Sequence, residues 1–378
     1  MFSYPIPFTP PTTEDDKLSW LRLIRSRKFG VSTFHRLLSD YGSAQAALIA
    51  LPEIAQSSGL SDYQTCSETA ARVELLAGEK IGATLLCKND PTYPADLAAL
   101  SDAPPVLWAR GDVGLLKRPM IAIVGARNAS SLGTRMARRL AEGLAEAGIV
   151  VVSGMARGID TVAHAAALQS GTIAVLAGGV DIVYPAENAH LADQIAGQGL
   201  ILSEQPIGLD PVARHFPMRN RIISGLCKAV VVVEAAAQSG SLITARMALE
   251  QGRDVFAVPG HPFDGRAGGC NILIRDGATL VRGPEDVLNA LNLPLPAAAA
   301  PARHQAAPPP EPPPPPAPPP DPLRLASAIL EKLGPSPLAE DQLLRDLGIT
   351  AAHAAEQLLK LELLGRIQRA PGGLLTRA

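Results

Sequence analysis

Residues 149–160 read IVVVSGMARGID, a run of β-branched residues followed by two glycines and an aspartate that can cap a helix. A run of this length is typical of a buried strand, and the glycines let the backbone turn tightly or approach a ligand closely. The same order of apolar run, glycine-bearing turn and amphipathic segment recurs through residues 81–291. It predicts an α/β domain, a parallel sheet covered by helices on both faces.

The predicted strands and helices alternate along this block. We expect strands at 120–125, 149–153, 172–177, 199–203, 229–234 and 254–258, and helices at 131–147, 160–170, 188–197 and 241–251. Ligands of open α/β sheets gather beyond the carboxyl ends of the strands. The turns after the strands are therefore the first places to look for a binding site.

Both flanks of the block predict further domains. Residues 1–14 are expected to be flexible, and residues 15–80 show three helical periods with glycines between them, typical of a small helical domain of the SAM or helix-hairpin-helix kind. Residues 292–322 are rich in Pro and Ala, and twelve of the fifteen residues at 308–322 are Pro. This composition favours an extended polyproline II spacer.

The last domain, residues 323–378, predicts three helices followed by a short hairpin, the pattern of a winged helix. Its third helix starts with AAHAAE at 351–356, where a reader of duplex DNA would carry basic or amide side chains. The domain is therefore expected to contact protein or to be vestigial rather than to read a duplex.

Composition excludes several classes of protein. The formal net charge is −2, so nucleic acid could be bound only through a local basic patch. No apolar run approaches the ~20 residues of a membrane span, and the start of the chain lacks the apolar stretch of a signal peptide. The four cysteines and seven histidines show no metal-ligand spacing. We expect a cytoplasmic protein without metal or cofactor.

The turns carry groups suited to phosphate. Gly125 and Arg127 follow the first predicted strand, although the turn lacks the GxGxxG pattern of dinucleotide sites. The hydroxyls and N–H groups of SGS at 239–241 open a helix and could form an anion site. Arg219, Asn220 and Arg221 lie close to Phe216, a combination that suits phosphates and stacked bases.

These turns resemble the DNA-processing protein A family (DprA, also called Smf). The resemblance rests on VGAR at 124–127, SGMARGID at 153–160, SE at 203–204, FPMRNRII at 216–223, SGSLITA at 239–245 and GRDVFAVPG at 252–260. It implies a non-catalytic homodimer with an extended Rossmann-like core that binds and protects single-stranded DNA and loads the RecA recombinase onto it in natural transformation.

The resemblance also implies which residues hold the strand. The candidate DNA-binding residues are Gly125, Arg127, Ser153, Gly154, Arg157, Gly158, Phe216, Arg219, Asn220, Arg221, Ser239, Gly240 and Ser241. Arg127 occupies the position of the family's strand-holding arginine, and Phe216 or Met155 would support a base. Ala126 stands where Ser or Thr is frequent in the family, and Ala186 where a pocket Lys is often found.

Two other functions stay open on the sequence. The same turns could hold a nucleotide in a nucleoside-phosphate hydrolase of the lysine-decarboxylase-like Rossmann group, with Glu204 or Glu234 assisting a water molecule. The chain could also be an adaptor whose linker and winged helix recruit another protein.

Overall fold

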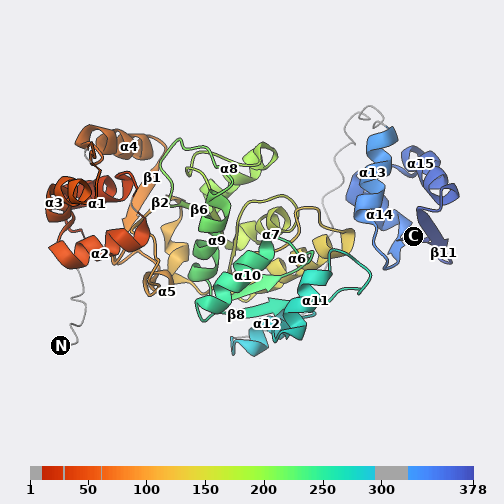
Figure 1. Ribbon diagram of the computed structural model, residues 1–378. Coiled ribbons are helices and arrows are strands. Elements are labelled where there is room, and N and C mark those ends of the chain that lie inside the picture. The colour runs from red at the N-terminus through yellow and green to blue at the C-terminus, as the bar shows by residue number, and fades with distance from the viewer. Residues whose placement is uncertain (1–10, 29, 61, 294–321) are drawn as a thin grey trace.

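The computed structural model describes residues 11–28, 30–60, 62–293 and 322–378, and Figure 1 shows their arrangement. A nine-stranded sheet at the centre has the order β1-β2-β6-β5-β4-β3-β7-β8-β9. Its strands are β1 (Ala83–Cys87), β2 (Val106–Gly111), β3 (Met120–Val124), β4 (Val150–Ser153), β5 (Thr172–Val175), β6 (Leu200–Ser203), β7 (Ala229–Val232), β8 (Asp254–Ala257) and β9 (Thr279–Leu280).

The six predicted strands are confirmed as β3 to β8, which pair in parallel. The sheet continues beyond the prediction, because β2 pairs antiparallel with β6 and β1 pairs antiparallel with β2. The segment between β1 and β2 contains only the short helix α5 (Ala95–Ala98), so no strand–helix–strand alternation marks these two strands in the sequence.

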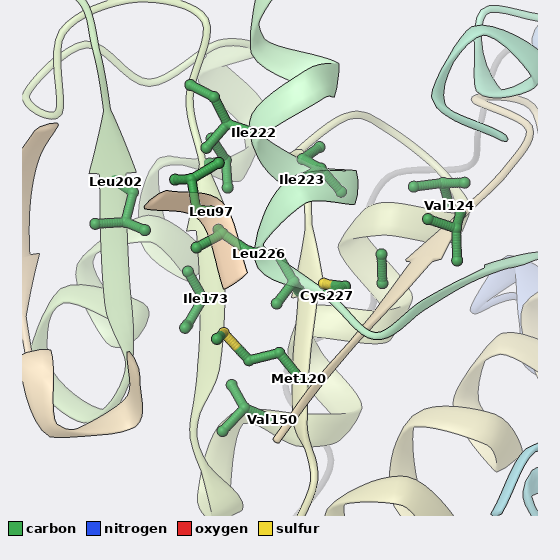
Figure 2. Packing of buried hydrophobic residues seen from close by; sticks show 14 of the residues in the cluster. Leu97, Met120, Val124, Val150, Ile173, Leu202, Ile222, Ile223, Leu226 and Cys227 are labelled. Atoms are coloured by element: carbon green, nitrogen blue, oxygen red, sulfur yellow. The ribbon is translucent and has the colours of Figure 1, made fainter. Parts of the chain in front are cut away.

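Helices cover both faces of the sheet. One face carries α6 (Ser131–Glu146), α7 (Ile159–Ala167) and α12 (Pro284–Ala290), and the other carries α9 (His215–Leu226), α10 (Ser241–Glu250) and α11 (Gly268–Arg275). Alternate residues of each strand face opposite sides. In β3, Met120 and Val124 pack with α9, whereas Ile121 and Ile123 pack with α6 and α7. Figure 2 shows the core between the sheet and α9, which includes Met120 and Val124.

The N-terminal domain consists of four helices, α1 (Glu14–Arg25), α2 (Val31–Tyr41), α3 (Ala44–Ser57) and α4 (Glu68–Lys80). Thr13 and Asp16 form a capping box at the start of α1, so the chain is ordered slightly before the predicted boundary at residue 15. Its core is continuous with the buried residues on the side of β1 and β2, together with α8 (Ala189–Gln198).

The C-terminal domain is the winged helix that the sequence predicts. It contains α13 (Pro322–Lys332), α14 (Glu340–Leu347) and α15 (Ala351–Leu363), with β11 (Ile367–Ala370) and β12 (Leu374–Arg377) as the wing. A two-residue strand, β10 (Leu338–Ala339), adds to the wing by pairing with β12. Most of the predicted spacer, residues 294–321, lies outside the described residues.

The winged helix lies beside the central domain at the end opposite the N-terminal helices (Figure 1). Across the four described ranges, none of the helices combines the length and apolarity that a bilayer crossing demands.

Candidate nucleic-acid interface

A cavity of about 650 Å³ opens beyond the carboxyl ends of β3 and β4. It collects six of the candidate residues that the sequence singles out: Arg127, Gly154, Arg157, Gly158, Phe216 and Arg219. These residues come from two turns and from α9, so the fold brings together segments that are up to 92 positions apart.

Two glycines allow the turns to approach one another. Gly158 has a φ of +76°, and a Cβ atom there would lie 2.3 Å from the carbonyl oxygen of Ala126. A Cβ atom on Gly125 would lie 2.6 Å from Cγ1 of Ile159. Both glycines are therefore needed for packing between the turn after β3 and the start of α7, and neither has to touch a ligand to be required.

Arg219 forms the floor of the cavity. It is buried, and its Nη1 donates a 2.7 Å hydrogen bond to the carbonyl oxygen of Val175. Burial lowers the pKa of Arg219 to about 10, against the opposing effect of the Asp160 carboxylate, and the nearby charge of Arg127 lowers it further. Within the described part of the chain, the buried Nε of Arg219 has no hydrogen-bond partner, so the protein leaves part of this guanidinium's donor capacity unsatisfied.

Asp160 balances the charge of Arg219. It is buried, and its Oδ2 accepts from the backbone N–H groups of Gly154 (3.1 Å) and Ala156 (3.2 Å). Burial raises the pKa of Asp160, and the charge of Arg219 acts in the opposite direction. The carboxylate therefore helps to hold the turn after β4 in place.

Arg127 lies at the mouth of the cavity, against an aromatic side chain. Its Cζ is 5.7 Å from the centroid of the Phe216 ring, within the range of a cation–π contact. Phe216 also meets Tyr184 edge to face, with 5.7 Å between the ring centroids. None of the described acidic residues forms an ion pair with Arg127, so its charge remains available to a ligand.

Tyr184 is a site residue that the sequence did not single out. It lines the cavity and is 56% exposed. The sequence signal for Tyr184 was its position after the turn that follows β5. That turn lies on the same edge of the sheet as the turns after β3 and β4. Together with Phe216, it gives the cavity an aromatic wall on which a base could stack.

Arg157 lines the cavity and forms an exposed ion pair with Glu187. Its Nε lies 2.7 Å from Oε1 of Glu187, and both side chains are more than half exposed. An exposed pair of this kind contributes little to stability and opens readily. Arg157 can therefore exchange its carboxylate for a phosphate.

The expected anion sites at helix starts are already filled by the protein itself. At the start of α6, Glu234 accepts from the N–H of Ser130 (2.9 Å) and from its hydroxyl (2.5 Å). Gly154 and Ala156 donate to Asp160 at the start of α7, as described above. At α10, the N–H of Ser241 donates to the hydroxyl of Ser239 (3.3 Å). These bonds occupy part of each helix start, and the guanidinium groups are the clearest phosphate-binding groups of the site.

Seven candidate residues do not line the cavity: Gly125, Ser153, Asn220, Arg221, Ser239, Gly240 and Ser241. Ser153 is buried and donates to the carbonyl oxygen of Ile123 (2.6 Å). Arg221 lies on another face of α9, 2.5 Å from Oε2 of Glu204, with both side chains about one-tenth exposed. The helical rotation between positions 219 and 221 separates two arginines that are close in sequence.

Met155 is fully buried in the core, so the expectation that it supports a base is wrong. His164 is also buried, and its Nδ1 lies 2.8 Å from the hydroxyl oxygen of Thr172. Burial lowers the pKa of His164 to about 3, with the charge of Arg219 acting in the same direction, so the ring is neutral at pH 7.

The two glutamates considered for hydrolysis are engaged elsewhere. Glu204 pairs with Arg221 outside the cavity, and Glu234 holds Ser130. Among the side chains that the structure describes, no three or more His, Cys, Asp or Glu residues are grouped to hold a metal ion.

Three family models match this chain. A model described as DNA recombination-mediator protein A matches residues 84–292, more than half of the sequence. A DprA-like N-terminal HHH domain matches residues 14–77, and a DprA winged helix domain matches residues 310–373.

Curated relatives agree with these matches. The chain is 50% identical over 201 residues to the DNA processing protein DprA of Streptococcus pneumoniae, covering 53% of this chain and 71% of the relative. It is 41% identical over 292 residues to the Smf protein of Escherichia coli, covering 76% of each.

Two solved structures are also similar. One is the X-ray structure of DprA from Streptococcus pneumoniae, with a TM-score of 0.61, 39% identity, and coverage of 72% of this chain and 97% of the other. The second is DprA from Helicobacter pylori, from work on its single-stranded DNA binding mode, with a TM-score of 0.52, 32% identity, and coverage of 56% and 95%.

Proposed function

Because this chain belongs to the DNA recombination-mediator protein A family, also known as DprA or Smf, we propose that it binds single-stranded DNA at the cavity beside Arg127. The observation that carries the proposal is that two arginines, Arg127 and Arg219, line the same cavity. Arg127 lies free over Phe216, and buried Arg219 keeps an unpartnered Nε behind it. Guanidinium groups suit phosphate oxygens, and the ring suits a base.

The similarity to the Helicobacter pylori protein supports the same ligand, since that protein is described by its single-stranded DNA binding mode. The chemistry of this cavity agrees with a ligand that is recognised by its backbone. The net charge of −2 does not oppose this, because affinity depends on the local field at the site.

Arg127→Ala tests the proposal. We expect weaker binding of fluorescent oligo-dT and a salt slope lower by about 0.7, the change for one phosphate contact on a single strand. Arg138→Ala is the control, because Arg138 is exposed on α6 and does not line the cavity. Equal binding by a folded Arg127→Ala variant would remove this residue from the site.

We propose that the bound strand is protected and handed to the RecA recombinase, and that the protein acts in the cytoplasm as a homodimer without catalysing a reaction. Family membership supports this role. The test is recombinase loading onto oligo-dT coated with a single-strand-binding protein. The protein should accelerate loading, and Arg127→Ala should remove most of the acceleration.

A nucleotide-hydrolysing enzyme is the competing function. The two glutamates considered for this role are not placed for it, because Glu204 pairs with Arg221 outside the cavity and Glu234 holds Ser130. Incubation with nucleoside monophosphates should release no free base. Release of base that is lost in Glu234→Gln would favour the enzyme instead.

A further inference from the structure

A second cavity, of about 700 Å³, lies between the central domain and the winged helix. Its inner wall includes Arg135 and Arg139 of α6 and His261 in the segment after β8. Its outer wall is built by the C-terminal domain, from Lys332 to Leu338. The proposed function does not use this space, although the end of the GRDVFAVPG motif lines it.

The winged helix is held there by a specific contact. Arg266 donates to the carbonyl oxygens of Glu331 (2.7 Å) and Leu333 (3.0 Å), at the C-terminal end of α13. A guanidinium at this end satisfies carbonyls that lack helical partners and complements the helix dipole. Asp264 fixes the arginine through a 3.1 Å contact with its Nε.

A second contact fixes the domain at α6. The hydroxyl of Ser131, at the start of that helix, donates to the Asp346 carboxylate of α14. Because Arg266 and Ser131 hold different helices of the winged domain, they fix its position and its orientation together.

Lys332 joins the two cavities. It lines the cavity beside Arg127 and also the cavity beside Arg139. Neither Lys332 nor Arg135 has an ion-pair partner among residues 11–28, 30–60, 62–293 and 322–378. Both cations are therefore free to meet an anion.

The acidic groups nearby are mostly engaged. In the second cavity, Glu234 is held by Ser130 and Asp264 by Arg266. Arg139 meets Glu285 at 3.6 Å, but both side chains are about 60% exposed, so the pair is weak. In the first cavity, Glu331 lies next to Lys332 and offsets part of its charge.

We propose that the two cavities form one groove for single-stranded DNA, closed on its outer side by the docked winged helix. The strand would run from Arg127 past Lys332 to Arg135 and Arg139. The inference rests on the proposed function and adds a second phosphate-binding stretch, together with a role for the C-terminal domain in building it.

The test compares a short oligo-dT of about 5 nucleotides with a long one of about 16, by fluorescence anisotropy over a range of salt. We expect the wild type to bind the long strand more tightly and with a steeper salt slope. Arg139→Ala should lower the slope for the long strand by about 0.7 and leave the short strand unaffected. Lys332→Ala should lower the slope by about 0.7 for both strands, because Lys332 lines both cavities.

Lys360→Ala and Arg138→Ala are the matched controls. Lys360 is an exposed lysine of the same domain that lines neither cavity, and Arg138 is the neighbour of Arg139. Arg266→Gln removes the cap on α13, so it should lower long-strand binding as Lys332→Ala does. Adding Lys332→Ala to it should then cost little more.

Three results would overturn the inference. One is equal binding of the long strand by Lys332→Ala and Lys360→Ala. Another is tighter binding by Arg266→Gln, which would make the docked domain a lid over the site. If the wild type bound neither oligonucleotide, the proposed function would fail and this inference with it. Normal binding of the short strand alone would leave the proposed function standing.

Discussion

A Cβ atom on Gly154 would lie 1.9 Å from Nη1 of Arg219, so the turn after β4 and the buried guanidinium fit only while residue 154 has no side chain. This contact sets the floor of the cavity. Arg219 cannot retreat freely, because the same Nη1 donates a hydrogen bond to the carbonyl oxygen of Val175.

Gly154→Ala should therefore be costly. The added methyl group must displace Arg219 or the turn, and overpacking of this kind destabilises a protein by about 1–3 kcal/mol. Urea unfolding measures the loss, and oligo-dT binding should weaken in the same variant. Gly197→Ala is the control, because Gly197 lies in α8 and a methyl group there would point into open space. It should be neutral or slightly stabilising.

Arg221→Ala should lower the stability of the protein without changing its affinity for single-stranded DNA. It leaves the buried Glu204 carboxylate without its cation, and breaking a buried pair costs about 3–5 kcal/mol. The side chains of this pair are 12% and 11% exposed. Thermal unfolding gives the stability, and oligo-dT binding is measured well below the transition. Weaker binding by the folded variant would return Arg221 to the DNA site.

Glu187→Gln should strengthen binding of single-stranded DNA. It removes a negative charge from the cavity and frees Arg157, so we expect an affinity about two- to fivefold higher at low salt. Stability should change by no more than about 0.5 kcal/mol. Glu68→Gln breaks a similar exposed pair with Arg72, far from the cavity, and should change neither property. An unchanged affinity in Glu187→Gln would mean that Arg157 does not reach the strand.

His164 should make the fold sensitive to acid. The pKa of this ring is lowered from 6.5 to about 3 on folding, chiefly by burial, so the unfolded chain takes up a proton first. Its contribution to stability is therefore complete above pH 6.5 and is lost as the pH falls toward 3. The slope is at most about 1.4 kcal/mol per pH unit.

His164→Asn keeps a polar partner for Thr172 and cannot titrate in this range. Urea unfolding at about pH 7.5 and pH 5 should show a smaller loss of stability in this variant than in the wild type. The remaining histidines are common to both proteins and cancel in the comparison. Equal losses would show that His164 does not carry the acid sensitivity.

The sequence allowed the parallel core to be predicted because strands β3 to β8 each combine a buried apolar run with a glycine-bearing turn. The antiparallel strands β1 and β2 were not predicted, because β2 joins the sheet by pairing with β6, nearly 100 positions away, and β1 pairs with β2. Register with a distant strand leaves no periodic signal in a short segment.

The site was predicted in part for the same reason. The turns identified Arg127, Gly154, Arg157 and Gly158, which do line the cavity. Sequence proximity could not separate Arg219 from Arg221, because only the helical rotation of α9 and the position of Glu204 decide which one faces the cavity. Nor could it show that a distant carboxylate meets the start of α6, since Glu234 accepts from Ser130 across 104 positions.

The carboxylate of Glu234 at the start of α6 has a consequence for selectivity in the cell. The N–H groups at a helix start favour phosphates such as ATP and orthophosphate, and here Glu234 occupies part of that site by accepting from the N–H of Ser130. Single-stranded DNA loses less affinity, because its many weak phosphate contacts reinforce one another along the strand. Abundant small phosphates would therefore compete poorly for a protein built in this way.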